Sequence, residues 1–191
     1  MQYLGALMGF SLLLGSMSFS VRSAAAPPVV TQTATVEPSY TVTLTAYNAV
    51  PEQTSSHPFV TASGAYSNPG IIAARSQDLA SELPFGTIIA LDGSGISSNN
   101  TCGYKVVVPH IGYRVIGDTM NARYTNRIDV LLGTKTNYIA PDGSVVNAAN
   151  VLGICRGVTI RVVGHVDINH LPKTQAELAA IVEKNSALAI K

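Results

Sequence analysis

The chain has 191 residues and a formal net charge of +1 at pH 7, with 47% hydrophobic and only 12% charged residues. This length suits one ordinary domain with short appendages, and the apolar content is sufficient for a core. The near-neutral charge argues against a nucleic-acid binder, because such proteins normally carry a basic face. A neutral polymer is a better match as a partner than a polyanion.

Residues 1–25 are predicted to be a signal peptide. Residues 4–19 form an uncharged apolar run, and residues 23–26 (Ser-Ala-Ala-Ala) supply the small side chains of a signal-peptidase site. The run also approaches the roughly 20 residues of a membrane span, so a retained N-terminal anchor is the alternative. We therefore expect a secreted, periplasmic or envelope protein that contacts a membrane only if this segment is retained. Residues 26–39, rich in Pro and Thr, are predicted to be an extended linker.

Residues 40–168 are predicted to form a β domain. Alternating or β-branched segments predict strands at 40–47, 71–74, 87–91, 105–108, 113–116, 126–132 and 158–163. One helical turn with Ser76 as N-cap is expected at 76–83, and an irregular stretch at 133–156 with a turn at 141–143. In the tail 169–191, Thr174 followed by Glu177 predicts a capped helix. Many short strands without a fixed repeat favour a small β-barrel, because closure removes exposed edges.

The chain has two cysteines, Cys102 and Cys155. In an oxidising compartment, an even number of cysteines with a long separation favours a structural disulfide. Two buried free thiols are the alternative. No Cys or His pair has the spacing of metal ligands, so neither a metal nor another cofactor is predicted.

Two aspartates, Asp118 and Asp129, are the candidate chemical groups. Asp118 ends one predicted strand, and Asp129 lies on the polar side of the next, between Ile128 and Val130. Neighbouring strands can bring both carboxyl groups to one mouth of a barrel, where one would keep its proton near neutral pH. Such a group can act as general acid on a glycosidic oxygen. The structural alternative is a turn cap at Asp118 and a surface ion pair between Asp129 and Arg127.

Five short motifs in order carry a resemblance to a known family. They are Thr-Ala-Tyr-Asn at 45–48, Thr-Ala-Ser-Gly at 61–64, Leu-Pro-Phe-Gly-Thr at 83–87, and Gly-Asp-Thr-Met-Asn at 117–121 with Asn-Arg-Ile-Asp-Val at 126–130. Together they resemble the 3D (three-aspartate) domain of MltA-type lytic transglycosylases and of YabE-like and RlpA-like cell-wall proteins. The resemblance covers residues 43–163 and implies a mainly β fold: a six-stranded double-psi β-barrel with long loops and a short C-terminal helix. Residues 119–124 depart from the Gly-rich segment that the family commonly has there.

The resemblance also implies an activity on peptidoglycan glycan strands. Asp129 would be the general acid/base and Asp118 its partner, while Asp78 would stand for the family's first aspartate or serve as a loop carboxylate. The expected glycan contacts are Asp78, Thr61, Ser63, Tyr47 and Tyr124. The structural alternatives are ordinary packing for the tyrosines and hydrogen bonds to the backbone for Thr61 and Ser63. A monomeric lytic transglycosylase of this kind cleaves the β-1,4 bond between N-acetylmuramic acid and N-acetylglucosamine and leaves a 1,6-anhydro sugar. The alternative is a non-catalytic glycan-binding or expansin-like cell-wall module.

Overall fold

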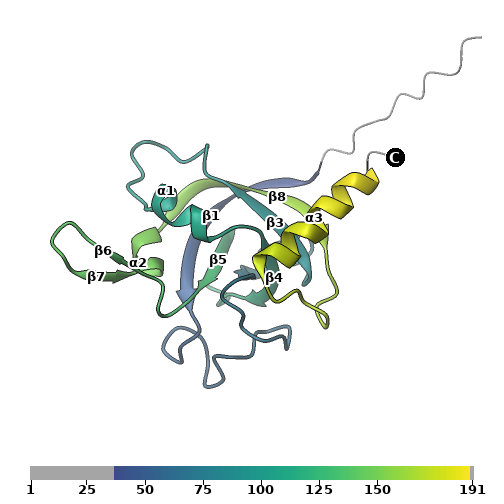
Figure 1. The fold of residues 1–191 in the computed structure, drawn as a ribbon, viewed down its shortest axis with the longest axis horizontal. Helices are drawn as coiled ribbons and strands as arrows, with labels where there is room; N and C mark the ends of the chain where they lie inside the picture. Colours follow the sequence, from purple (N-terminus) through teal and green to yellow (C-terminus); the bar gives the residue numbers. More distant parts are fainter. Residues whose placement is uncertain (1–36, 190–191) are drawn as a thin grey trace, which may run out of the picture. The chain divides into compact units, whose positions relative to one another are not determined.

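The computed structural model describes residues 37–189 (Figure 1). The predicted signal peptide and nearly all of the predicted linker lie outside the described residues. Within residues 37–189 we find no helix with the length and apolar character that a membrane crossing requires.

Most of the regular structure is β. The strands are β1 (Ser39–Asn48), β2 (Ile72–Arg75), β3 (Thr87–Asp92), β4 (Arg114–Thr119), β5 (Arg127–Leu132), β6 (Asn137–Ile139), β7 (Val145–Asn147) and β8 (Cys155–His165). The helices are α1 (Tyr104–Val107), α2 (Ala148–Leu152) and α3 (Gln175–Ala189), with 3-10 turns η1 (Gln77–Leu79) and η2 (Val108–His110).

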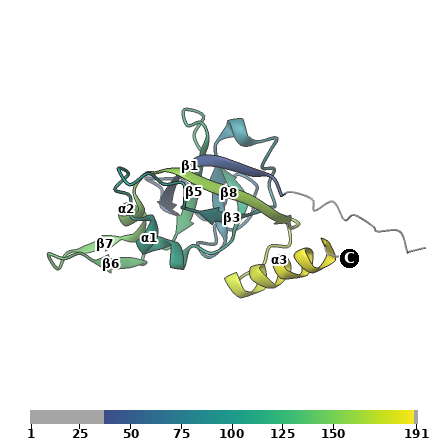
Figure 2. The same ribbon diagram turned by 90° about the horizontal axis from the view of Figure 1, so that it is seen from above.

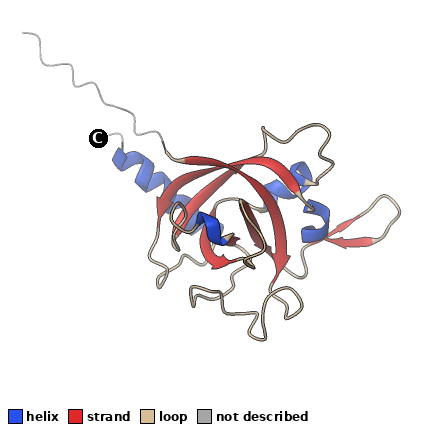
Figure 3. Ribbon diagram, turned by 180° about the vertical axis from the view of Figure 1, so that it is seen from behind, coloured by secondary structure: helices blue, strands red, loops and turns tan. Residues whose placement is uncertain are grey.

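Six strands close into a barrel in the order β1-β5-β2-β4-β3-β8 (Figure 3). The pairs β1–β5 and β2–β4 are parallel, whereas the other neighbours are antiparallel. The remaining strands, β6 and β7, form a hairpin that projects from the barrel (Figure 2). The prediction of a mainly β, six-stranded barrel with a C-terminal helix is confirmed.

Alternating burial along the strands defines the inside and outside of the barrel. On β5, Ile128 and Val130 are fully buried in a cluster to which all six barrel strands contribute. Arg127 and Asp129, which alternate with them along the strand, are only half-buried. Successive side chains of a strand point to opposite faces, so Arg127 and Asp129 lie on the outer face. The predicted polar side of this strand is therefore the outside of the barrel.

A second apolar cluster covers part of the outer face. It includes Leu178 and Val182 of α3, which lies alongside the barrel (Figures 1 and 2). The side chain of Gln175 fixes the start of α3, because its Nε2 donates to the carbonyl oxygens of Gly70 and Tyr113, both at 2.6 Å. The helix is thus a brace on the barrel. Its predicted cap, Thr174, is present, because the Thr174 hydroxyl accepts a hydrogen bond from the backbone N–H of Glu177.

The predicted disulfide joins Cys102 to Cys155 across 53 residues. It ties the loop that precedes α1 to the first residue of β8. A disulfide is typical of proteins in an oxidising compartment.

The predicted strand at residues 105–108 is wrong, since this segment forms α1 and the start of η2. Tyr104, Val107 and Ile111 are buried in the interior cluster, whereas Val106 between them is 51% exposed. That spacing is helical, and burial along one helix face outweighs the β propensity of consecutive valines.

Residues 133–156 are more regular than predicted, because they contain the β6–β7 hairpin and α2. The expected turn is present, with the backbone N–H of Gly143 donating to the carbonyl of Ala140 at 2.8 Å. Helix α2 begins after Asn147, whose side-chain oxygen accepts a hydrogen bond from the backbone N–H of Ala149 at 3.0 Å.

Ser76 precedes η1, as predicted, but its side chain does not cap that turn. The hydroxyl instead accepts a hydrogen bond from the backbone N–H of Arg127 at 3.0 Å. Ser76 therefore links η1 to the start of β5.

Candidate functional site

Strand register brings Asp118 and Asp129 to either side of one residue. Ala74 on β2 pairs with Asp118 on β4 and, on its other side, with Asp129 on β5. Paired residues of neighbouring strands project from the same face and lie about 5 Å apart. The Cα atoms of the two aspartates are therefore about 10 Å apart across the sheet. Ala74 between them is buried in the outer apolar cluster.

Asp129 is held by β1. Thr45 is its partner in the parallel β1–β5 pair, and the Thr45 hydroxyl donates a hydrogen bond of 2.8 Å to Asp129 Oδ1. Asp129 forms no ion pair with Arg127 or with any other cation of residues 37–189. The alternative of a simple surface pair therefore does not describe this carboxyl group.

The surroundings of Asp129 raise its pKa to about 6, mainly because burial disfavours the charged carboxylate. The hydrogen bond from Thr45 and the charge of Arg127 act in the opposite direction, and the charge of Asp118 adds a smaller increase. Near neutral pH this carboxyl group can both donate and accept a proton, as a general acid/base must.

Asp118 is held by three hydrogen-bond donors. Its Oδ1 accepts from the backbone N–H groups of Ala62 and Thr119, both at 2.8 Å, and its Oδ2 accepts from the Tyr47 hydroxyl at 2.9 Å. Burial and the nearby Asp118 raise the pKa of Tyr47, so its hydroxyl remains a donor. Asp118 is thereby fixed in orientation and joined to the 61–64 turn.

Thr61 and Ser63 form that turn. Their hydroxyl oxygens lie 2.9 Å apart, and the Thr61 hydroxyl also donates to the carbonyl of Ala65. Thr61 is buried, whereas Ser63 is half-buried. Thr61 therefore stabilises the turn, and Ser63 is the better placed of the two for contact with a ligand.

Tyr124 lies in the connection between β4 and β5. The guanidinium groups of Arg123 and Arg127 lie 4.7 and 4.6 Å from the centre of its ring, and Arg123 also donates to the Tyr124 hydroxyl at 2.8 Å. These cation–π contacts order the ring and bring two positive charges to the connection that leads into β5.

Asp78 is exposed on η1 and hydrogen-bonds neither of the other two aspartates. Its Oδ2 accepts from the backbone N–H of Asn126 at 2.8 Å, and Asn126 has the unusual φ of 47°. Hydrogen bonds, that of the Ser76 hydroxyl first, lower the pKa of Asp78. In this structure Asp78 stabilises the turn that leads into β5, which is the loop-carboxylate alternative.

Sequence reasoning missed Thr45 and Ala62, the residues that hold Asp129 and Asp118. The alternation of Thr41, Thr43 and Thr45 along β1 marks a polar face and could have indicated Thr45. Ala62 lies in the Thr-Ala-Ser-Gly motif at 61–64, but its side chain gives no sign of a role, because it contributes only its backbone N–H. No group of three or more His, Cys, Asp or Glu side chains among residues 37–189 is arranged to hold a metal ion.

Comparison of the sequence with protein-family models and with curated proteins finds no match.

Proposed function

We propose that this protein acts on peptidoglycan in the cell envelope as a lytic transglycosylase. The observation that carries the proposal is Asp129, a half-buried carboxyl group with a pKa of about 6 that faces outward and is separated from Asp118 by Ala74. The closed barrel with two parallel strand pairs is compatible with the double-psi fold of the 3D domain. The disulfide agrees with an exported protein.

In the proposed reaction, protonated Asp129 donates its proton to the oxygen of the β-1,4 bond as that bond to N-acetylmuramic acid breaks. The C6 hydroxyl of the same sugar then bonds to its anomeric carbon, and Asp129 takes the hydroxyl proton. The proton count is unchanged after one turnover, and neither water nor a cofactor is consumed. Asp118, fixed by its three donors, orients the sugar and adds negative charge beside the oxocarbenium-like transition state.

The test is digestion of purified sacculi, with the products identified by mass spectrometry. We expect 1,6-anhydro muropeptides from the unmodified protein and a loss of at least about 100-fold for Asp129→Asn, as for removal of a general acid. Asp142→Asn is the matched control, because Asp142 is an exposed carboxyl group in the β6–β7 turn. If correctly folded, unmodified protein releases no 1,6-anhydro product, the proposed activity is wrong.

A second candidate function is glycan binding without cleavage. It is favoured by the position of the two aspartates, because neither of them lines the cleft of about 730 Å³ that Ser63 borders, so the carboxyl groups do not lie in that cleft. Under this alternative the protein sediments with sacculi, releases no product, and is retained equally well after Asp129→Asn.

A further inference from the structure

The cleft beside the 61–64 turn has features of a second binding region. It has a volume of about 730 Å³ and lies between residues 63–71 and residues 168–173. Its apolar lining includes Ile71, Ile168, Leu171 and Tyr66, a residue that is 66% exposed. Its uncharged polar lining consists of Ser63, Asn68 and Asn169. Lys173 is the one charged residue among the described residues that line it.

This cleft is connected to the aspartate pair through the 61–64 turn. The backbone N–H of Ser63, which lines the cleft, donates to the carbonyl of Gly117 at 3.3 Å. The preceding residue, Ala62, donates to Asp118. From the opposite wall Ile168 reaches Gly117, because a Cβ atom at Gly117 would lie 3.8 Å from Ile168 Cδ1. The 61–64 turn therefore contacts Asp118 through Ala62 and lines the cleft through Ser63 and Gly64.

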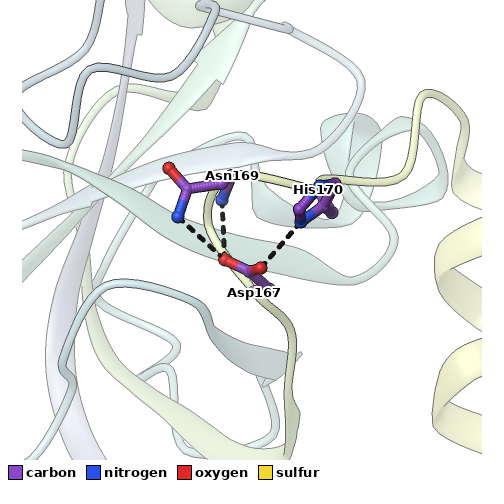
Figure 4. A network of polar contacts seen from close by, with 3 residues as sticks. All are labelled: Asp167, Asn169 and His170. Carbon is purple, nitrogen blue, oxygen red and sulfur yellow. Dashed lines mark hydrogen bonds and ion pairs between the residues drawn. The ribbon is translucent and has the colours of Figure 1, made fainter.

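The wall formed by residues 166–173 is held in place by polar contacts. Asp167 accepts hydrogen bonds from the backbone and side chain of Asn169, and His170 Nδ1 lies 2.7 Å from its other oxygen (Figure 4). Asn68 joins this wall to the opposite one, since its Nδ2 donates to the carbonyl of Lys173 at 2.9 Å. The cleft is thus formed in the folded protein before any ligand binds.

The charges at this wall leave Lys173 available to an anion. The Glu177 carboxylate accepts a hydrogen bond from the backbone N–H of Lys173 at 2.7 Å. The two oxygens of the Asp167 carboxylate contact Asn169 and His170. The ammonium group of Lys173 forms no ion pair within residues 37–189. A ligand carboxylate can therefore pair with it.

Apolar walls with one cation suit a short acidic peptide with small apolar side chains. Of the polar side chains in the lining, Asn68 is hydrogen-bonded to Lys173 and Gly70, and the Asn169 amide donates to Asp167. A sugar would therefore find few free partners for its hydroxyl groups, which costs free energy. We propose that the cleft binds the acidic stem peptide attached to N-acetylmuramic acid, so that the protein selects glycan that carries peptides. This inference rests on the proposed function, because it places the glycan of the same substrate at Asp118 and Asp129.

The first test uses a peptide without glycan. NMR titration with the dipeptide L-alanyl-γ-D-glutamate should shift the ring signals of Tyr66 and the methyl signals of Ile168 and Leu171. Reversal of charge in Lys173→Glu should weaken binding about 10-fold, since attraction becomes repulsion. Lys135→Glu is the matched control, because Lys135 is exposed and does not line the cleft. The inference is wrong if the dipeptide leaves these signals unchanged, or if N-acetylglucosamine oligomers shift them instead.

The second test compares intact sacculi with glycan strands stripped of peptides by an amidase. We expect retention on stripped strands to fall about 10-fold, and Lys173→Glu to reduce retention only on intact sacculi. Equal cleavage and retention on both materials would overturn the peptide cleft and leave the proposed function intact. If neither material is bound but the dipeptide titration succeeds, the proposed function is wrong and the cleft is an acidic-peptide site.

Discussion

The two parallel strand pairs of the barrel, β1–β5 and β2–β4, each carry one aspartate on the outer face. Asp129 in the first pair accepts one hydroxyl hydrogen bond at a site where burial raises its pKa to about 6. Asp118 in the second pair accepts three hydrogen bonds. Identical side chains on the two strand pairs therefore have different hydrogen-bond partners, and burial beside a single donor gives Asp129 a pKa that suits proton transfer.

Removal of the disulfide tests whether this difference is local. Cys102→Ser with Cys155→Ser should lower the free energy of unfolding by about 4 kcal/mol, because the bond restricts the unfolded chain over a long loop. The pKa of Asp129, measured by 13C NMR of its carboxyl carbon, should not change while the protein stays folded. A changed pKa in the double-serine variant would show that the Asp129 environment depends on the disulfide, whose Cys155 pairs with Leu44 beside Thr45.

Truncation of Asp118 tests the more strongly bonded side of the comparison. Asp118→Ala leaves the Tyr47 hydroxyl and the Ala62 N–H without their acceptor, so we expect a loss of about 2–3 kcal/mol in denaturant unfolding. Asp142→Ala, at an exposed turn, should cost less than about 1 kcal/mol. Equal losses would mean that the three donors contribute nothing to stability.

Replacement of Asp129 should raise the free energy of unfolding, whereas truncation of Asp118 should lower it. Its folded-state pKa of about 6 lies above the ordinary value of 3.8, so the folded protein binds the extra proton between these pH values and stability falls as pH rises through about 6. Asp129→Asn, which mimics the protonated form, should therefore gain on the order of 2 kcal/mol at pH 8 and little at pH 4. Thermal unfolding at both pH values measures this, and a variant less stable at pH 8 would contradict the raised pKa.

A smaller change should sharpen the comparison at Asp129 itself. Thr45→Val removes the hydrogen bond that favours the ionised carboxylate, so the pKa of Asp129 should rise by about 1 unit, whereas Thr45→Ser should keep it near 6. If the protonated form is the active one, the upper limb of the pH–rate profile should move by the same amount. An unchanged pKa of Asp129 in Thr45→Val would mean that the hydrogen bond from Thr45 has no effect on this pKa.

Much of the fold could be predicted from local patterns. Period-2 alternation located most barrel strands, and Thr174 with Glu177 located the start of α3, where the Thr174 hydroxyl accepts from the Glu177 N–H at 3.2 Å. Local patterns were insufficient at α1, where β-branched residues follow one another but Tyr104, Val107 and Ile111 repeat with helical spacing. Propensity there conflicts with periodicity, and burial against the barrel interior resolves the conflict.

By itself the sequence determined which residues alternate along β5 and hence that Asp129 stands opposite the core, because side-chain direction along a strand is a local property. It also predicted the disulfide between Cys102 and Cys155. Only the tertiary structure decided that β2 lies between β4 and β5, so that Ala74 separates Asp118 from Asp129. Strand pairing joins residues far apart in the chain, and the pKa of Asp129 depends on the water that this pairing excludes.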